Sequence, residues 1–313
     1  MHNVHPLVSI CVITYNSSKY VIETLESAKN QSYPNIELVI TDDGSTDNTA
    51  DVCKKWVVEN RQFFKNVVEL YNPSNSGVSA NCNKGISVCN GEWIKLIAGD
   101  DILLIDCIKT YVEYVESTAD VMWVGSKHIP FREKSGNTTN VYSKSDVDRI
   151  AKLKTIGQKN AEEQFGIVLN KDIIFSTTLF YNKQIFKQVR FNEKYRTLED
   201  YPFKLDALKL GIKYHHIDHD TVLYRISDNS ISNNLSKKLF SNWFITYHQF
   251  EVDYKYRYMS CYSRLLNTYR YNIKLLFNRI GLNRKTIPCY LLFHIVSFEL
   301  GSIFRKLVEK NNY

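Results

Sequence analysis

The feature that most constrains the fold is a regular alternation of short apolar runs and helical patterns over the first 125 residues. The run at residues 7–14 is almost wholly apolar and rich in β-branched residues, which is typical of a strand buried on both faces. Comparable runs follow, with helical patterns between them, at residues 36–41, 67–71, 93–97 and 121–125. Strands that alternate with helices at this spacing predict βαβ units. The expected fold class is therefore α/β, a Rossmann-like, mainly parallel sheet flanked by helices.

Two acidic pairs stand directly after two of these runs. Asp42-Asp43 ends the run at 36–41, and Asp100-Asp101 follows the run at 93–97 after a glycine. Because the carboxyl ends of parallel strands meet at one edge of a sheet, both pairs are expected at the edge where such sheets bind ligands. Adjacent carboxylates suit Mg²⁺ or Mn²⁺, which take oxygen ligands and keep waters and substrate phosphates. An Asp-Asp turn alone is also compatible with a solvated turn or a helix cap.

The middle of the chain has a weaker pattern. Residues 128–160 are polar and irregular, which predicts a loop or insertion over the site. Residues 175–181 are strand-like, and a helix is expected from Asp200 to Gly211. Two further strands are expected at 212–217 and 222–225, followed by helices from residue 236 to the end.

The charge is unevenly distributed along the chain. Residues 235–313 hold 13 Lys and Arg but 4 Asp and Glu, and 17 of the 41 aromatic residues, whereas residues 1–234 carry a net charge of −2. This contrast predicts a near-neutral body (1–234) and a basic, aromatic helical extension (235–313). The extension could pack on the body, or it could associate with an anionic membrane surface. No nucleic-acid-binding motif accompanies the basic charge, so nucleic acid is not an expected partner.

Cysteine usage and hydropathy narrow the class further. The seven cysteines are scattered and form no C-x-x-C, which argues against a thiol-rich zinc site or a redox motif and favours a reducing cytoplasm. The first residues lack the pattern of a signal peptide. The most apolar stretch, residues 287–304, is interrupted by His294 and Glu299, so a membrane-spanning helix is not expected there.

Five blocks of sequence occur in a fixed order, at residues 6–16, 30–40, 42–49, 75–86 and 91–94. Gly99-Asp100-Asp101 follows them, and Glu199-Asp200 comes about a hundred residues later. Together these motifs resemble the family-2 glycosyltransferases of the GT-A fold, of the type that builds bacterial surface polysaccharides. The resemblance covers about residues 6–232. It implies a catalytic domain at 1–234, with a nucleotide-binding half at about 6–126 and an acceptor-binding half at about 127–234.

The resemblance implies donor-side roles position by position. Thr14 and Tyr15 would lie beside the nucleotide base, and Asp43 would hydrogen-bond that base, most often a uracil. Asp100 would contact the ribose or the sugar. Asp101 would hold Mn²⁺ or Mg²⁺ on the diphosphate.

On the acceptor side, the resemblance makes Asp200 the base that deprotonates the acceptor hydroxyl. Glu199 and Arg225 would have acceptor or supporting roles. Pro202 suits the first turn of a helix, so Asp200 could instead be only a helix N-cap. Relatives often carry a further Asp where this chain has Ala98, and a His where it has Ser227, so no third metal ligand is predicted.

The expected function is inverting transfer of a sugar from a UDP-linked donor to a saccharide acceptor, carried on a lipid, during surface polysaccharide assembly. The expected location is the inner face of the cell membrane, as a peripheral protein. One alternative is a sugar nucleotidyltransferase, which would need a glycine-rich basic phosphate loop after the first strand; residues 14–19 are not such a loop. Another alternative is a non-catalytic protein of the same fold that binds saccharide or membrane.

Overall fold

The computed structural model describes residues 5–134, 137–226, 238–241 and 243–297. The chain divides into two compact units, residues 1–226 and residues 227–313. The domain boundary expected near residue 234 lies outside the described residues.

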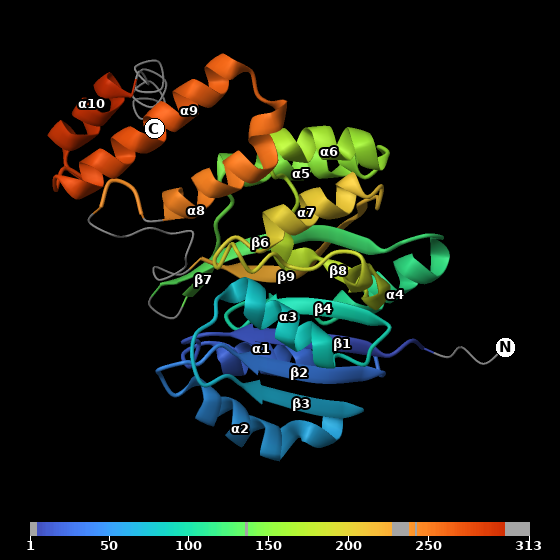
Figure 1. Cartoon of the computed structure of the whole chain (residues 1–313). Helices are drawn as coiled ribbons and strands as arrows, with labels where there is room; N and C mark the ends of the chain where they lie inside the picture. The colour runs from blue at the N-terminus through green and yellow to red at the C-terminus, as the bar shows by residue number, and fades with distance from the viewer. Residues whose placement is uncertain (1–4, 135–136, 227–237, 242, 298–313) are drawn as a thin grey trace. The chain divides into compact units, whose positions relative to one another are not determined.

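The first unit is built on one mixed sheet of nine strands within the described residues, in the order β3-β2-β1-β4-β8-β6-β9-β5, with β7 paired to β6. The strands are β1 (Val8–Thr14), β2 (Ile36–Asp42), β3 (Asn66–Tyr71), β4 (Trp93–Ala98), β5 (Ile102–Leu103), β6 (Trp123–Lys134), β7 (Asn137–Asn140), β8 (Phe180–Asn182) and β9 (His215–Arg225). Figure 1 shows β3, β2, β1 and β4 side by side. These four are parallel, as the alternating sequence pattern predicts. Beyond β4 the sheet is mixed, because β8 runs antiparallel to both β4 and β6.

The register of the parallel half brings the two acidic pairs to the same edge. β1 lies between β2 and β4, with Thr14 opposite Asp42 and Ile13 opposite Ala98. The residues that follow β2 and β4 therefore flank the carboxyl end of β1. This arrangement confirms the predicted convergence of the acidic turns.

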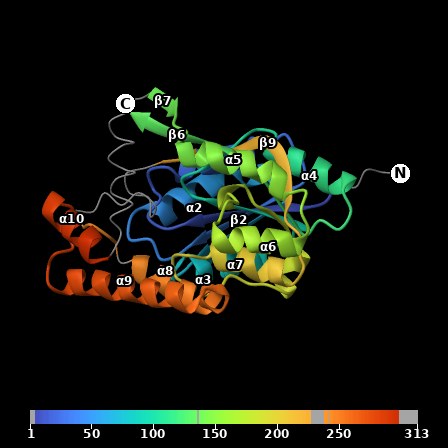
Figure 2. The same cartoon turned by 90° about the horizontal axis from the view of Figure 1, so that it is seen from above.

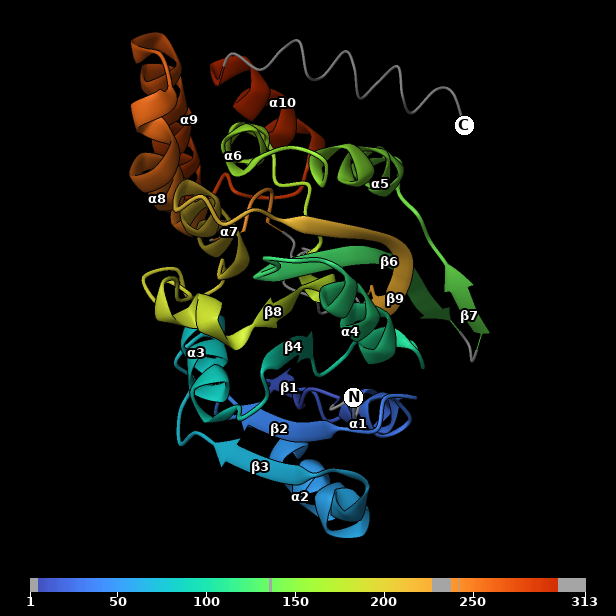
Figure 3. The same ribbon diagram turned by 90° about the vertical axis from the view of Figure 1, so that its right-hand side faces the viewer.

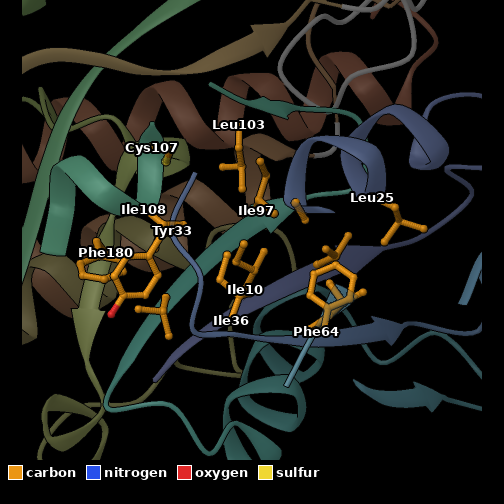
Figure 4. Close-up of a cluster of buried hydrophobic side chains, with 14 of the residues drawn as sticks. Ile10, Leu25, Tyr33, Ile36, Phe64, Ile97, Leu103, Cys107, Ile108 and Phe180 are labelled. Atoms are coloured by element: carbon orange, nitrogen blue, oxygen red, sulfur yellow. The ribbon is translucent and has the colours of Figure 1, made fainter. Parts of the chain in front are cut away.

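Helices cover the sheet and bury its apolar residues. They are α1 (Val21–Lys29), α2 (Thr49–Asn60), α3 (Val78–Val88), α4 (Cys107–Ser117), α5 (Lys144–Ile156), α6 (Ala161–Asn170) and α7 (Asp200–Lys209). One core cluster joins Ile10 of β1 to Leu25 of α1 and Ile108 of α4 (Figure 4). On the other face α3 lies so close to β1 that a Cβ added at Gly85 would be 2.6 Å from Sγ of Cys11. Each of these strands is therefore covered on both faces, which explains its uninterrupted apolar sequence.

The loop predicted over residues 128–160 is wrong. β6 continues to Lys134 beside β9 (Figure 3), and α5 occupies Lys144–Ile156. A capping box starts α5, since Ser143 and Asp146 bond each other's backbone N–H groups, and Leu153 and Ile156 bury its inner face. The polar exposed faces of the strand and helix concealed both periodicities in the sequence. Residues 212–225, expected as two strands, contain one strand, β9, with a register irregularity.

A second capping box begins α6, where Asn160 and Glu163 pair in the same way. No element had been predicted there. Figure 2 shows α6 beside α7, and Tyr201 of α7 donates from its hydroxyl to the carbonyl of Val168 in α6 at 2.7 Å. The acceptor half of this unit thus has a helical layer of its own.

The second unit is helical in its described part, as predicted. It contains α8 (Trp243–Phe250), α9 (Cys261–Arg279) and α10 (Ile287–Val296), with a π turn and a 3₁₀ turn between α8 and α9. The predicted break at Gly281 is present, with a φ of 78°, and Pro288 lies in the first turn of α10. Within the described residues, no helix combines the length and apolarity needed to cross a membrane.

Candidate active site

The end of β1 is tied to the first acidic pair. Oδ1 of Asp42 accepts from Oγ1 of Thr14 at 2.9 Å, and its Oδ2 accepts from the backbone N of Ser45 at 2.8 Å. Thr14 is buried by this contact, whereas the next residue, Tyr15, has 47% of its surface exposed. Tyr15 is therefore the one of the two that presents its ring at the strand end. Their contact with a nucleotide base stays a prediction.

Asp43 holds the loop in front of α3. Its Oδ1 accepts from the backbone N and the hydroxyl of Ser76, at 2.9 and 2.7 Å, and its Oδ2 accepts from the backbone N of Gly77 at 2.8 Å. The same loop is bound to the segment before α7, because the backbone N of Val78 donates to the carbonyl of Arg196 at 2.9 Å. Asp43 thus connects the nucleotide half to the segment that leads into Glu199 and Asp200. Sequence reasoning gave Asp43 a ligand role but missed this connecting one.

The second acidic pair lies in a tight turn against β1. A Cβ added at Gly99 would lie 2.8 Å from Cγ2 of Thr14, so the turn approaches the strand end as closely as glycine allows. Asp101 is 1% exposed, and its Oδ1 accepts from the backbone N of Arg225 at 2.9 Å. Burial, and then the charge of Asp100, raise the pKa of Asp101 well above its ordinary value. A divalent cation beside this pair would offset both effects, so the donor set fits a hard metal ion.

Among the described residues, no three His, Cys, Asp or Glu side chains are arranged to hold a metal ion. A cation at Asp101 would therefore take most of its remaining ligands from water and from the phosphates of a bound nucleotide.

Arg225 supports the acidic turn from β9. Its Nε donates to the carbonyl of Asp100 at 2.7 Å, while its other nitrogens pair with Glu23, at 2.8 Å, and with Glu133. The guanidinium also lies over the rings of Tyr20 and Phe131. Burial opposes its charge, but the two carboxylates outweigh burial and raise the pKa of Arg225. The expected supporting role thus corresponds to a buried ion-pair network, whose carboxylates from α1 and β6 are too distant in sequence to have been predicted.

The two carboxylates at the start of α7 have different surroundings. Oδ2 of Asp200 accepts from Nζ of Lys204 at 2.9 Å and from the hydroxyl of Ser176. Burial alone would raise the pKa of Asp200, but the charge of Lys204 and these hydrogen bonds outweigh it and lower the pKa. For Glu199, burial and then the charge of Asp200 raise the pKa to about 7. Neighbouring carboxylates with pKa values pushed apart are typical of functional sites.

Three of the predicted site carboxylates converge on α3. Burial raises the pKa of Cys82 in α3, and the charges of Glu199, Asp200 and Asp43 raise it further. The N-cap position of α7 is taken by Glu199, with no side-chain cap bond. The structure thus brings the start of α7 to the same end of α3 as the loop that Asp43 holds.

A mainly parallel sheet with acidic turns at its carboxyl edge is the architecture of the GT-A enzymes that use nucleotide sugars. The family described as "Glycosyl transferase family 2" matches residues 9–190. The chain belongs to this family.

Two curated relatives and two solved structures illustrate the similarity. Glycosyltransferase GlyG of Streptococcus pneumoniae is 30% identical over 229 residues, 72% of each chain. The Escherichia coli enzyme "UDP-Glc:alpha-D-GlcNAc-diphosphoundecaprenol beta-1,3-glucosyltransferase WfaP" is 28% identical over 233 residues, 74% of this chain and 82% of WfaP. These relatives make this chain a glycosyltransferase of the type found in polysaccharide biosynthesis.

The structure of Staphylococcus aureus TarS 1–349 with UDP-GlcNAc superposes with a TM-score of 0.57 at 19% identity, over 79% of this chain and 66% of that one. A mannosyltransferase from Pyrobaculum calidifontis, solved with GDP-Man and Mn²⁺, gives 0.53 at 13% identity, over 95% of this chain and 70% of that one. At these identities the likeness establishes the GT-A fold. The chain spans about two thirds of the TarS structure.

Proposed function

We propose that this protein transfers a sugar from a UDP-linked donor to a saccharide acceptor, with inversion at the anomeric carbon. The observation that carries the proposal is the placement of two sets of carboxylates. The turn of Asp100 and Asp101 lies at the carboxyl end of β1, and Glu199 and Asp200 begin α7 on the segment bound to the loop of Asp43. A donor held at the first set would present its anomeric carbon toward the second.

The proposed reaction is a single displacement. Asp200 takes the proton of the acceptor hydroxyl, and the oxygen attacks the anomeric carbon as the bond to the diphosphate breaks. The bonding electrons leave on the nucleoside diphosphate. A Mn²⁺ or Mg²⁺ ion held at Asp101 would supply positive charge that stabilises this leaving group. Attack opposite the leaving group, with no covalent enzyme intermediate, inverts the configuration.

The acceptor we propose is a saccharide on a polyprenyl diphosphate. The name of the E. coli relative specifies a diphosphoundecaprenol-linked acceptor. A lipid-linked acceptor requires the enzyme to work at the inner face of the membrane, and the second unit of this chain has the surface for it.

That surface consists of two apolar stripes on a cationic background. α9 exposes a stripe at helical spacing, and α10 exposes another: Tyr262, Leu265, Tyr269 and Leu276, then Ile287, Leu291 and Ile295. Residues 261–297 contain six Lys and Arg and no Asp or Glu. Exposed aliphatic and aromatic side chains among cations fit the interface of a bilayer rich in anionic lipid. We therefore propose peripheral membrane association through these helices.

We expect the Leu265→Ser/Leu276→Ser variant to bind vesicles of phosphatidylglycerol and phosphatidylcholine at least ~10-fold more weakly, because each leucine would lose about 1.5–3 kcal/mol of burial. Co-sedimentation with vesicles measures this. The matched control is Val58→Ser on α2 of the first unit, a valine that is 78% exposed and should leave binding unchanged. Wild-type binding to neutral and anionic vesicles alike, or full binding by the double variant, would contradict the proposal.

Thermal unfolding against a panel of nucleotide sugars, with and without Mn²⁺, tests the donor assignment. A UDP-sugar present at ~100-fold its Kd should stabilise the folded state by about 2.7 kcal/mol and raise Tm by several degrees, more with Mn²⁺ than without. A response only to nucleoside triphosphate with sugar 1-phosphate would favour the nucleotidyltransferase alternative. Stabilisation by saccharide but by no nucleotide sugar would favour a non-catalytic binder.

A further inference from the structure

We infer that Lys204, with Asp172 and Ser176, forms a buried clamp that positions the carboxylate of Asp200 and keeps it ionised for proton abstraction. The inference rests on the proposed function, since it takes Asp200 as the base. Lys204 touches no substrate in this scheme and is a positioning residue.

The geometry of the clamp is closed around one ammonium group. Lys204 lies one turn after Asp200 on α7, and its side chain is fully buried. Its Nζ donates to Oδ2 of Asp172 at 2.8 Å, to the hydroxyl of Ser176 at 2.8 Å and to Oδ2 of Asp200 at 2.9 Å. A fourth contact, to the carbonyl of Ile174, is also 2.8 Å long. Four partners around one buried cation leave it a single position.

Ser176 completes a ring, because it accepts from Lys204 and donates its own hydroxyl proton to Oδ2 of Asp200. Both donors to the Asp200 side chain therefore engage the same oxygen. This fixes the plane of the carboxylate and leaves Oδ1 to receive the acceptor proton. The oxygen released by that proton forms the bond to the anomeric carbon as the diphosphate departs with its electron pair.

The segment that carries Ser176 is itself held rigidly. Buried Lys95 of β4 donates from Nζ to the carbonyl of Thr177 at 2.6 Å, and the hydroxyl of Tyr111 in α4 donates to the carbonyl of Thr178. Arg149 of α5 donates to the carbonyl of Ile174 at 3.1 Å. Three elements thus fix the backbone on which the clamp is built, which is what a positioning network requires.

The charges around Asp200 set its protonation. Lys204 is the cation in contact with it, and Asp172 competes for that same cation. Glu199 precedes Asp200 on the chain, Asp172 is also close to Arg149, and the neutral groups Cys82 and Tyr181 face Asp200 from α3 and β8. Removing Lys204 would leave buried carboxylates without their shared cation, which favours protonation of Asp200. Removing the charge of Asp172 would give Asp200 undivided use of Lys204, which favours its ionised form.

The test compares Lys204→Met with Asp172→Asn by the single-turnover rate of sugar transfer from pH 5 to 9. With Lys204→Met, the acid limb of the profile should move up by about one pH unit or more, and transfer at pH 7 should fall at least ~10-fold. With Asp172→Asn, the acid limb should stay in place or move down. UDP affinity, measured by calorimetry, should change less than ~3-fold in both. A merely structural role predicts equal losses at every pH, and that result would overturn the inference.

If Lys204→Met does not fold, Ser176→Ala replaces it as the probe. This variant removes one donor to Asp200 and keeps the ion pairs, so the acid limb should move up by a smaller amount, and Lys204→Met/Asp172→Asn should restore folding by removing one charge of each sign. An unmoved acid limb in Ser176→Ala would count against the clamp. The failure of the proposed function is separate, since it appears as turnover by Asp200→Asn, whatever the clamp variants do.

Discussion

Asp200→Asn is expected to lower the rate of sugar transfer at least about 1,000-fold while leaving the fold and UDP binding intact. General-base catalysis contributes ~10²–10⁴-fold, and an amide cannot accept the acceptor proton. Asparagine keeps the size of the side chain, and Lys204 keeps its contacts with Asp172, Ser176 and the carbonyl of Ile174. The folded state should therefore persist.

The measurement is single-turnover transfer by the purified variant, with its thermal unfolding and UDP affinity recorded alongside. Asp51→Asn is the matched control, because Asp51 is an exposed aspartate on α2 whose carboxylate reaches Lys54 at 3.9 Å. Near-normal transfer by a folded Asp200→Asn protein would refute the assignment of the base.

Asp101→Asn should abolish the dependence of donor binding on Mn²⁺ and reduce transfer by at least ~100-fold. The amide oxygen can still accept from the backbone N of Arg225, so the turn should survive. The variant lacks the negative charge that would hold a cation against the diphosphate. Because burial and Asp100 raise the pKa of Asp101, the neutral amide is expected to leave the metal-free protein as stable as before, or more so.

Thermal unfolding with donor, with and without Mn²⁺, tests this result together with a transfer assay. Asp120→Asn serves as the control, since Asp120 is an exposed residue with a φ of 60°, a conformation that asparagine adopts readily. An undiminished Mn²⁺-dependent increase in Tm for Asp101→Asn would place the metal elsewhere.

The parallel half of the fold was predictable because its signal is local. A strand covered on both faces must be apolar throughout, and residues 7–14 and 36–41 state this directly. The positions of the acidic pairs then follow from topology, because parallel neighbours end at the same edge. β6 and α5 were missed because a polar outer face weakens both the strand and the helix pattern. The capping box of Ser143 and Asp146 was the one local signal that could have identified α5.

The chemistry around the site could be predicted only in part. Asp101 and Asp200 could be proposed from motifs, and Lys204 could have been found from its place one turn after Asp200. The carboxylates that hold Arg225 could not, because Glu23 and Glu133 come from α1 and β6. Nor could the contrast between Glu199 and Asp200 be read from two adjacent acidic letters. It arises because a buried lysine reaches one of them and not the other.

The sequence by itself therefore determined the class of fold, the family and the edge at which acidic groups gather, since these depend on periodicity and on residues close together in the chain. Only the tertiary structure decided which carboxylate has a cation, which oxygen of Asp200 is engaged and how the loop of Asp43 is bound to the start of α7. Those properties depend on burial and on contacts between residues tens to hundreds of positions apart. Protonation and orientation are set by distance in space, and the sequence alone does not specify that distance.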